Sequence, residues 1–218
     1  MIDLNGNGKV VQLPSVTTIL KVINKPALMK WAAKQAAKAV LSDPQKYNTP
    51  ELAADAIYDI RDESTERGRD AHKIAEDFVA GIHQPTHPYY ASIKSFFETK
   101  RPEVFYTEVL LVNTQWGYAG TADLIARVGP KTYVVDYKSS KAAYPEYHLQ
   151  VEAYRQCDLA ILKDGTRIEL HPMADAASIV LLRPDETFQW VEAHGDFGAF
   201  LAALTLFYWW SNSNDPSA

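Results

Sequence analysis

Three consecutive segments near the middle of the chain constrain its fold most. Residues 102–113, 117–128 and 132–140 are rich in β-branched and aromatic residues, and residues typical of turns separate them. Strands joined by connections this short are antiparallel neighbours in a sheet. We therefore expect a three-strand meander at the core of the fold.

Helix-prone segments flank the meander. Ser15 is an expected N-cap, Pro26 an expected first helical residue and Gly81 an expected helix stop. The expected helices cover residues 16–23, 26–41, 51–81, 88–100, 145–163 and 195–210, and two further strands are expected over 178–183 and 187–192. This order predicts an α/β or α+β fold with a mixed central sheet, flanked by helices and preceded by an N-terminal helical region.

The length of 218 residues and a hydrophobic content of 47% suit one domain with a sizeable core. We expect a single domain over residues 1–211, in which 1–100 is mainly helical, 101–193 carries the sheet and a helix, and 194–211 forms the last helix. Residues 212–218 lack apolar content and are expected to form a disordered tail.

Other features of composition exclude several classes of protein and of metal site. No run of about eighteen apolar residues is present, so we expect no membrane span, and a reducing cytoplasm is the expected compartment. The single cysteine, Cys157, excludes a disulfide framework. It also excludes a four-cysteine zinc or iron–sulfur site within this chain.

Charge is unevenly distributed along the chain. Residues 1–41 hold six lysines and one acid, which gives +5, while the whole chain has a net charge of −5, so the remainder carries −10. An acidic body with a basic arm suits a carboxylate site and a separate phosphate-binding surface. Lys30, Lys34 and Lys38 recur every four residues and predict a DNA-binding stripe on one helix face. The alternative is an ordinary solvated face.

Turn geometry places three carboxylates in one row across the meander. Asp123 and Asp136 lie at equal distances from the expected turn at 129–130, and Glu108 and Asp123 lie at equal distances from the expected turn at 114–117. Directly opposed Cβ atoms on paired strands are about 4.5–5.5 Å apart. A slip of one residue in either hairpin would turn the side chains of a strand to the other face.

Clustered carboxylates repel one another unless a positive charge lies between them. Oxygen ligands without cysteine suit Mg²⁺ or Mn²⁺. Lys138, two residues after Asp136, shares its face and offers a point charge for a water or a phosphate. For any one of these acids the alternative is a surface charge on an amphipathic strand.

Two of these segments resemble known motifs. GTAD at 120–123 and VVDYKSS at 134–140 resemble motifs II and III of the PD-(D/E)XK nuclease superfamily. The similarity looks closest to the RecB-like exonuclease branch. That branch carries a helical histidine upstream, here His72, and a downstream helix with Gln and Tyr four residues apart, here Gln150 and Tyr154.

The segment that begins at Pro14 is similar to the start of phage-encoded members of the branch and, more distantly, of mitochondrial genome maintenance exonucleases. The four cysteines of the iron–sulfur nucleases in this branch are missing, so no iron–sulfur cluster is expected. The resemblance implies a restriction-endonuclease-like fold.

The resemblance also implies roles for the matched residues. The implied metal ligands are His72, Asp123, Asp136, the backbone carbonyl of Tyr137 and, directly or through a water, Glu108. The implied catalytic residues are Glu108, Asp123, Asp136, Lys138, Gln150 and Tyr154. Lys138 would orient the attacking water, and the Gln–Tyr pair, on one helix face, would contact phosphate or Lys138. The alternative role for Tyr154 is packing in the core without contact to phosphate or Lys138.

The function that the resemblance implies is a Mg²⁺- or Mn²⁺-dependent deoxyribonuclease. It would act on DNA ends or single strands in recombination, repair or replication, and would leave a 5′-phosphate and a 3′-hydroxyl. The expected location is the cytoplasm of a bacterium or of a phage-infected host. The expected partner is DNA, and binding to a second copy of the chain or to another protein is left open. The alternatives are a structure-specific endonuclease of the same fold, an inactive DNA-binding module, and a carboxylate metalloenzyme with another substrate.

Overall fold

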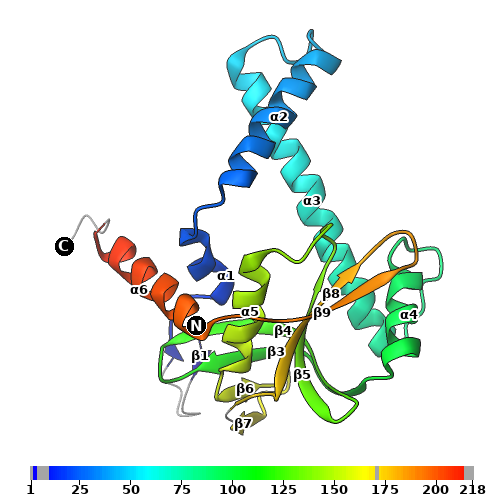
Figure 1. The fold of residues 1–218 in the computed structure, drawn as a ribbon, viewed down its shortest axis with the longest axis vertical. Helices are drawn as coiled ribbons and strands as arrows, with labels where there is room; N and C mark the ends of the chain where they lie inside the picture. The colour runs from blue at the N-terminus through cyan, green and yellow to red at the C-terminus, as the bar shows by residue number, and fades with distance from the viewer. Residues whose placement is uncertain (1, 4–9, 170–171, 214–218) are drawn as a thin grey trace. The chain divides into compact units, whose positions relative to one another are not determined.

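A computed structural model describes residues 2–3, 10–169 and 172–213 (Figure 1). The chain forms two compact units: residues 1–22 together with 71–218, and residues 23–70. Each unit is described by itself below. Among the described residues, no helix has both the length and the apolar character needed to cross a membrane.

The unit of residues 23–70 is helical. It contains α2 (Pro26–Ser42), which begins at the expected proline, and most of α3 (Pro50–Val79). The last residues of α3 belong to the other unit. After α3 the chain turns at Gly81, whose φ of 77° is in the left-handed region that favours glycine, and whose N–H donates to the carbonyl of Phe78.

The larger unit is built on a mixed sheet. Within the described residues the order is β7-β6-β3-β4-β5-β8-β9, and every neighbouring pair is antiparallel except β5 and β8. The strands are β3 (Glu103–Asn113), β4 (Tyr118–Val128), β5 (Lys131–Lys138), β6 (Leu159–Ile161), β7 (Arg167–Glu169), β8 (Ala176–Leu182) and β9 (Phe188–Glu192). The predicted three-strand meander, β3-β4-β5, and the mixed sheet are confirmed. A small separate sheet pairs β1 (Ile2–Asp3) with β2 (Val10–Val11).

The expected helix over 145–163 was wrong in its second half. The helix α5 (Pro145–Arg155) stops early, and Leu159–Ile161 form β6 against β3. Asn113 at the end of β3 donates to the carbonyl of Gln156, and the backbone N–H of Thr114 donates to Asp158 at 2.7 Å. Pairing with an open strand edge therefore overrides the local helical tendency.

Helices cover both faces of the sheet. On one face, the end of α3 and α4 (Tyr90–Lys100) pack through Ile74, Ile93 and Phe96 on Leu124 and Val135. Side chains alternate along a strand, so the odd-numbered residues of β8 lie on the other face. There α5 packs through Val151 on a cluster of Ala177, Ile179 and Leu181. Figure 1 shows α5 lying against the sheet.

Further helices pack beside α5. Ser15 caps α1 (Val16–Ile19) as predicted, because its side chain accepts from the N–H of Thr18 at 3.1 Å, and a 3-10 turn, η1 (Leu20–Val22), follows. The last helix, α6 (Phe197–Ser213), contacts α5 and η1. It runs two residues past the predicted boundary at 211, and the rest of the predicted tail, 214–218, lies outside the described residues.

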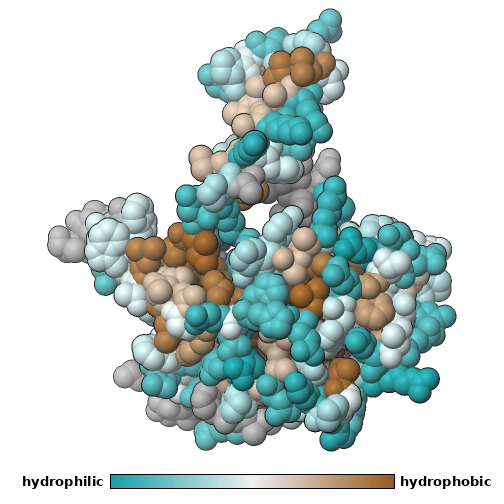
Figure 2. All heavy atoms as spheres, in the orientation of Figure 1, coloured by the Kyte–Doolittle hydropathy of each residue, from teal (hydrophilic) through white to brown (hydrophobic). Residues whose placement is uncertain are grey.

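The outer end of α6 is apolar and exposed. Trp209 and Trp210 are 60% and 61% exposed. Figure 2 shows apolar surface gathered over this helix. The buried part of α6 is its N-terminal half, where Phe200, Ala203 and Leu204 are enclosed.

Candidate active site and metal centre

The candidate site lies where β4 and β5 stop pairing. Their ladder ends at Leu124 opposite Val135, although β4 continues to pair with β3 and β5 continues to pair with β8. At this opening the carboxylate of Asp123 accepts a hydrogen bond from the backbone N–H of Tyr137 at 2.6 Å. A side chain thus replaces the missing ladder contact and fixes the two strands where they separate.

The strand register is the one predicted from the turns. Thr107 pairs with Leu124 and Val109 pairs with Ala122. The same register sets Glu108 opposite Asp123. The β4–β5 pairs follow the register that sets Asp123 against Asp136. The predicted register of both hairpins is therefore confirmed.

Glu108 departs from regular strand geometry. Its φ is 49°, in the left-handed region that costs a non-glycine residue of order 1–3 kcal/mol. In a regular strand, side chains alternate strictly between the two faces, and a left-handed residue breaks this alternation. The backbone at Glu108 thus re-aims a carboxylate at the point where the sheet opens.

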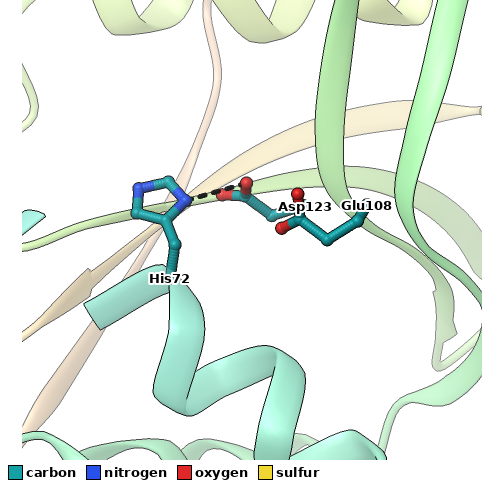
Figure 3. A group of neighbouring side chains, drawn as sticks. All are labelled: His72, Glu108 and Asp123. Carbon is teal, nitrogen blue, oxygen red and sulfur yellow. Dashed lines mark hydrogen bonds and ion pairs between the residues drawn. The ribbon is translucent and has the colours of Figure 1, made fainter. Parts of the chain in front are cut away.

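His72, near the end of α3, joins the carboxylates from outside the sheet. Its Nδ1 lies 2.9 Å from a carboxylate oxygen of Asp123. Figure 3 shows His72, Asp123 and Glu108 converging, and their ligand atoms all lie within 4.8 Å of one another. An imidazole and two carboxylates from three separate elements can hold one divalent ion.

Asp136 lies outside that group of ligand atoms and has partners of its own. One of its oxygens accepts from Gln150 Nε2 at 2.8 Å, and the other lies 2.5 Å from Lys138 Nζ. Gln150 in turn donates to the hydroxyl of Tyr154 at 3.0 Å. The predicted residues Asp136, Lys138, Gln150 and Tyr154 therefore form one network, and the part of Asp136 as a metal ligand stays a prediction.

Gly120 makes room for this network. A Cβ at Gly120 would lie 2.4 Å from a ring carbon of Tyr154, a distance that real Cβ atoms do not show. The ring of Tyr154, 3% exposed, therefore packs directly on the backbone of β4. The glycine of the GTAD segment serves close packing between α5 and the sheet.

Burial and charge together set the protonation of the site. Burial, and then the charge of Asp123, raise the pKa of Glu108 to about 6. Burial alone would lower the pKa of Lys138, but Asp136 and Asp123 raise it above its ordinary value. Lys138 is therefore an ammonium group at neutral pH, suited to donate a hydrogen bond and unsuited to accept a proton.

The same balance acts on His72 and Asp136. Burial lowers the pKa of His72, but the charge and hydrogen bond of Asp123 outweigh it, so the pKa is raised. Burial raises the pKa of Asp136 against the effect of Lys138. The pKa values of Glu108, Asp136 and His72 are all raised because negative charge is crowded and partly desolvated, which is the condition that a bound cation relieves.

A buried hydroxyl beside the site lacks a partner. Within the described residues, the hydroxyl of Tyr137 is buried without a hydrogen-bond partner, whereas both oxygens of Asp136 have a partner, one in Gln150 and the other in Lys138. Burial raises the pKa of that hydroxyl far above its ordinary value, and the charges of Asp123 and Glu108 raise it further. The donor set of His72, Glu108 and Asp123 fits an oxygen-preferring divalent ion such as Mg²⁺ or Mn²⁺.

The predicted lysine stripe belongs to the other unit. Lys30, Lys34 and Lys38 are all exposed on α2, and their spacing of four places them on one side of that helix. The exposed helical stripe is confirmed, while its contact with DNA stays a prediction.

Sequence reasoning missed two features beside the site. The Lys138 ammonium lies 5.0 Å from the ring centre of Tyr147, which shares a helix face with Gln150 and Tyr154, a spacing visible in the sequence. Glu76, one turn after His72 on α3, pairs with Lys163 at 2.6 Å. That ion pair joins residues 87 positions apart, and local sequence carries no signal for it.

No known family model matches the chain. A search of curated proteins also found no match.

Proposed function

We propose that this chain is a divalent-metal-dependent deoxyribonuclease of the PD-(D/E)XK type, acting on DNA ends or single strands as an exonuclease. The observation that carries the proposal is the convergence of His72 on the row formed by Glu108 and Asp123, with Lys138 held beside Asp136. These are the residues that the resemblance to the RecB-like branch assigns to phosphodiester hydrolysis.

The metal-holding residues would be His72, Glu108 and Asp123, whose ligand atoms are already gathered. When bound, the ion would stabilise negative charge on the phosphate and lower the pKa of the attacking water. Asp123 is fixed by the N–H of Tyr137, so its orientation does not depend on the ion. Glu108, with a pKa of about 6, is ionised at neutral pH and can bind the ion directly or through a water.

The network around Lys138 would orient the reactants. Asp136 and the ring of Tyr147 hold the ammonium of Lys138, and Gln150 holds Asp136. From this position Lys138 donates to the phosphate or to the water. The oxygen of the water would bond to phosphorus and give up a proton to solvent, the P–O3′ bond would break and the departing oxygen would take up a proton, which leaves a 5′-phosphate and a 3′-hydroxyl.

The test uses the full chain with an end-labelled single-stranded oligonucleotide. Cleavage is expected with Mn²⁺ or Mg²⁺, and none with excess chelator. Asp123→Asn is the matched inactive control, because it keeps the shape of the side chain and lowers its charge. Cleavage that persists after metal stripping would contradict the metal mechanism.

A closed circular single strand separates the exonuclease from an endonuclease. An exonuclease leaves the circle intact while degrading the linear form of the same sequence. Cleavage of the circle would favour the structure-specific endonuclease. Binding of DNA without cleavage under any divalent ion would favour an inactive DNA-binding module.

A further inference from the structure

An aromatic pair lies directly beside the lysine of the site. Tyr147 and Tyr144 meet edge to face, with ring centres 5.5 Å apart and an interplanar angle of 72°. The ammonium of Lys138 lies 5.0 Å from the centre of the Tyr147 ring. All three residues belong to the larger unit, and the two tyrosines flank the first turn of α5.

The two rings differ in exposure. Tyr147 is half-buried and packs against the core cluster of Val151, Ile179 and Leu181, so it is anchored. Tyr144 is 44% exposed, and although it is the N-cap of α5 its side chain makes no capping hydrogen bond. A rigid ring therefore supports an accessible one, at low cost in side-chain entropy.

The charge beside the pair indicates which ligand it can take. Lys138 is a partly buried cation, 16% exposed, and attracts a phosphate group. In a nucleic-acid strand each phosphate is followed by a sugar and a base, so a phosphate near Lys138 brings a base near Tyr144. Within a duplex both faces of a base are covered by its neighbours in the stack, whereas an unpaired or terminal base leaves a face free for an aromatic ring.

Resting on the proposed nuclease function, we propose that Tyr144, supported by Tyr147, is a stacking platform for one unpaired base of the strand whose phosphate is held at Lys138. Stacking tolerates any base, because each has an aromatic face. The platform therefore gives the site a preference for single-stranded or frayed DNA without a preference for sequence.

The experiment compares two ligands of equal length and equal phosphate number, a single strand with bases and a strand of abasic nucleotides. Binding is measured with the Asp123→Asn protein, so that neither ligand is cut. Adding Tyr144→Ala should weaken binding of the strand with bases about tenfold, the scale of losing one stacked base. Binding of the abasic strand should not change.

Two further variants serve as controls. Tyr144→Phe keeps the ring and should keep the preference for bases. Trp116→Ala removes another exposed ring, 43% exposed, from the β3–β4 turn and should leave both affinities unchanged. That turn begins six residues after Glu108, roughly 20 Å along the strand.

The outcomes separate this inference from the function on which it rests. If Tyr144→Ala weakens both ligands equally, or weakens neither, the platform is wrong even when the unmodified protein cleaves DNA. If the unmodified protein neither binds nor cleaves single strands, the proposed function fails and the platform fails with it. Loss of the preference for bases in Tyr144→Ala, restored in Tyr144→Phe, supports both.

Discussion

Polar side chains are held differently in the two compact units. In the larger unit, Asp123 and Asp136 are 7% and 2% exposed and have defined partners on neighbouring elements. In the helical unit, Lys30, Lys34 and Lys38 stand exposed along α2. The first arrangement fixes atoms at hydrogen-bonding distances, and the second leaves charges free to move in solvent.

The difference follows from the cost of burial. A buried charge without a partner is strongly destabilising, so each buried group comes with a specific contact that sets its position. Exposed lysines are hydrated and screened, and one can stand in for another. Substitutions in the carboxylate site should therefore have large effects that are specific to each residue. Substitutions on α2 should have small effects that add up.

The largest expected effect is on turnover. Asp123→Asn, Asp136→Asn and Lys138→Gln should each lower the rate of DNA cleavage by at least about 10²-fold, the scale of losing one transition-state stabiliser. Single-turnover cleavage with saturating Mn²⁺ measures it, and circular dichroism checks the fold. A folded variant with near-normal turnover would remove that residue from the mechanism. The residue would then resemble the exposed lysines of α2, whose single substitutions are expected to have small effects.

The next effect concerns metal affinity. His72→Ala should weaken Mn²⁺ binding about 10–100-fold, measured by titration calorimetry, because it removes the ligand that approaches Asp123 from outside the sheet. Glu76→Gln is the matched control, one turn further along α3 and paired with Lys163. Equal affinities for the two variants would mean that His72 only supports the structure.

A third effect concerns packing beneath the site. Gly120→Ala should destabilise the fold by about 1–3 kcal/mol, because its Cβ would meet the ring of Tyr154. Denaturant unfolding measures the change. In a Tyr154→Ala background the same substitution should cost much less, and equal costs in both backgrounds would contradict direct contact.

A fourth and smaller effect depends on pH. The pKa of Glu108 is raised from 4.5 to about 6, so between these values the folded protein binds more protons than the unfolded chain, and stability falls as the pH rises. Glu108→Gln should therefore stabilise the metal-free protein at pH 7 by about 1 kcal/mol, allowing for solvent screening, or about 2–4 °C in Tm. At pH 4.5 the two proteins should melt alike. A gain that is the same at both pH values would contradict the charge explanation.

The smallest effect per residue is expected on α2. Each Lys→Gln change at 30, 34 or 38 should flatten the dependence of log affinity on log salt by about 0.7, and the triple variant by about 2. Binding should weaken about equally for unrelated sequences, because phosphates carry no sequence information. The measurement uses Asp123→Asn protein across a salt series. An unaltered slope would leave the stripe with a role in solubility alone.

The sequence by itself determined the meander, its register and the residues that share the site. Turn residues at fixed positions and the two-residue period of strands are local properties, so Glu108, Asp123 and Asp136 could be set in one row without coordinates. The glycine and the Gln–Tyr spacing of the matched segments are also local, and both take part in the network beside the site.

Only the tertiary structure decided how that row is used. The opening between β4 and β5, the left-handed backbone of Glu108 and the approach of His72 to Asp123 depend on contacts between distant segments. The same holds for β6, which formed where a helix was expected because the edge of β3 offered unpaired backbone groups. Local preferences are worth about a kcal/mol or less per residue, so non-local pairing and burial override them wherever they compete.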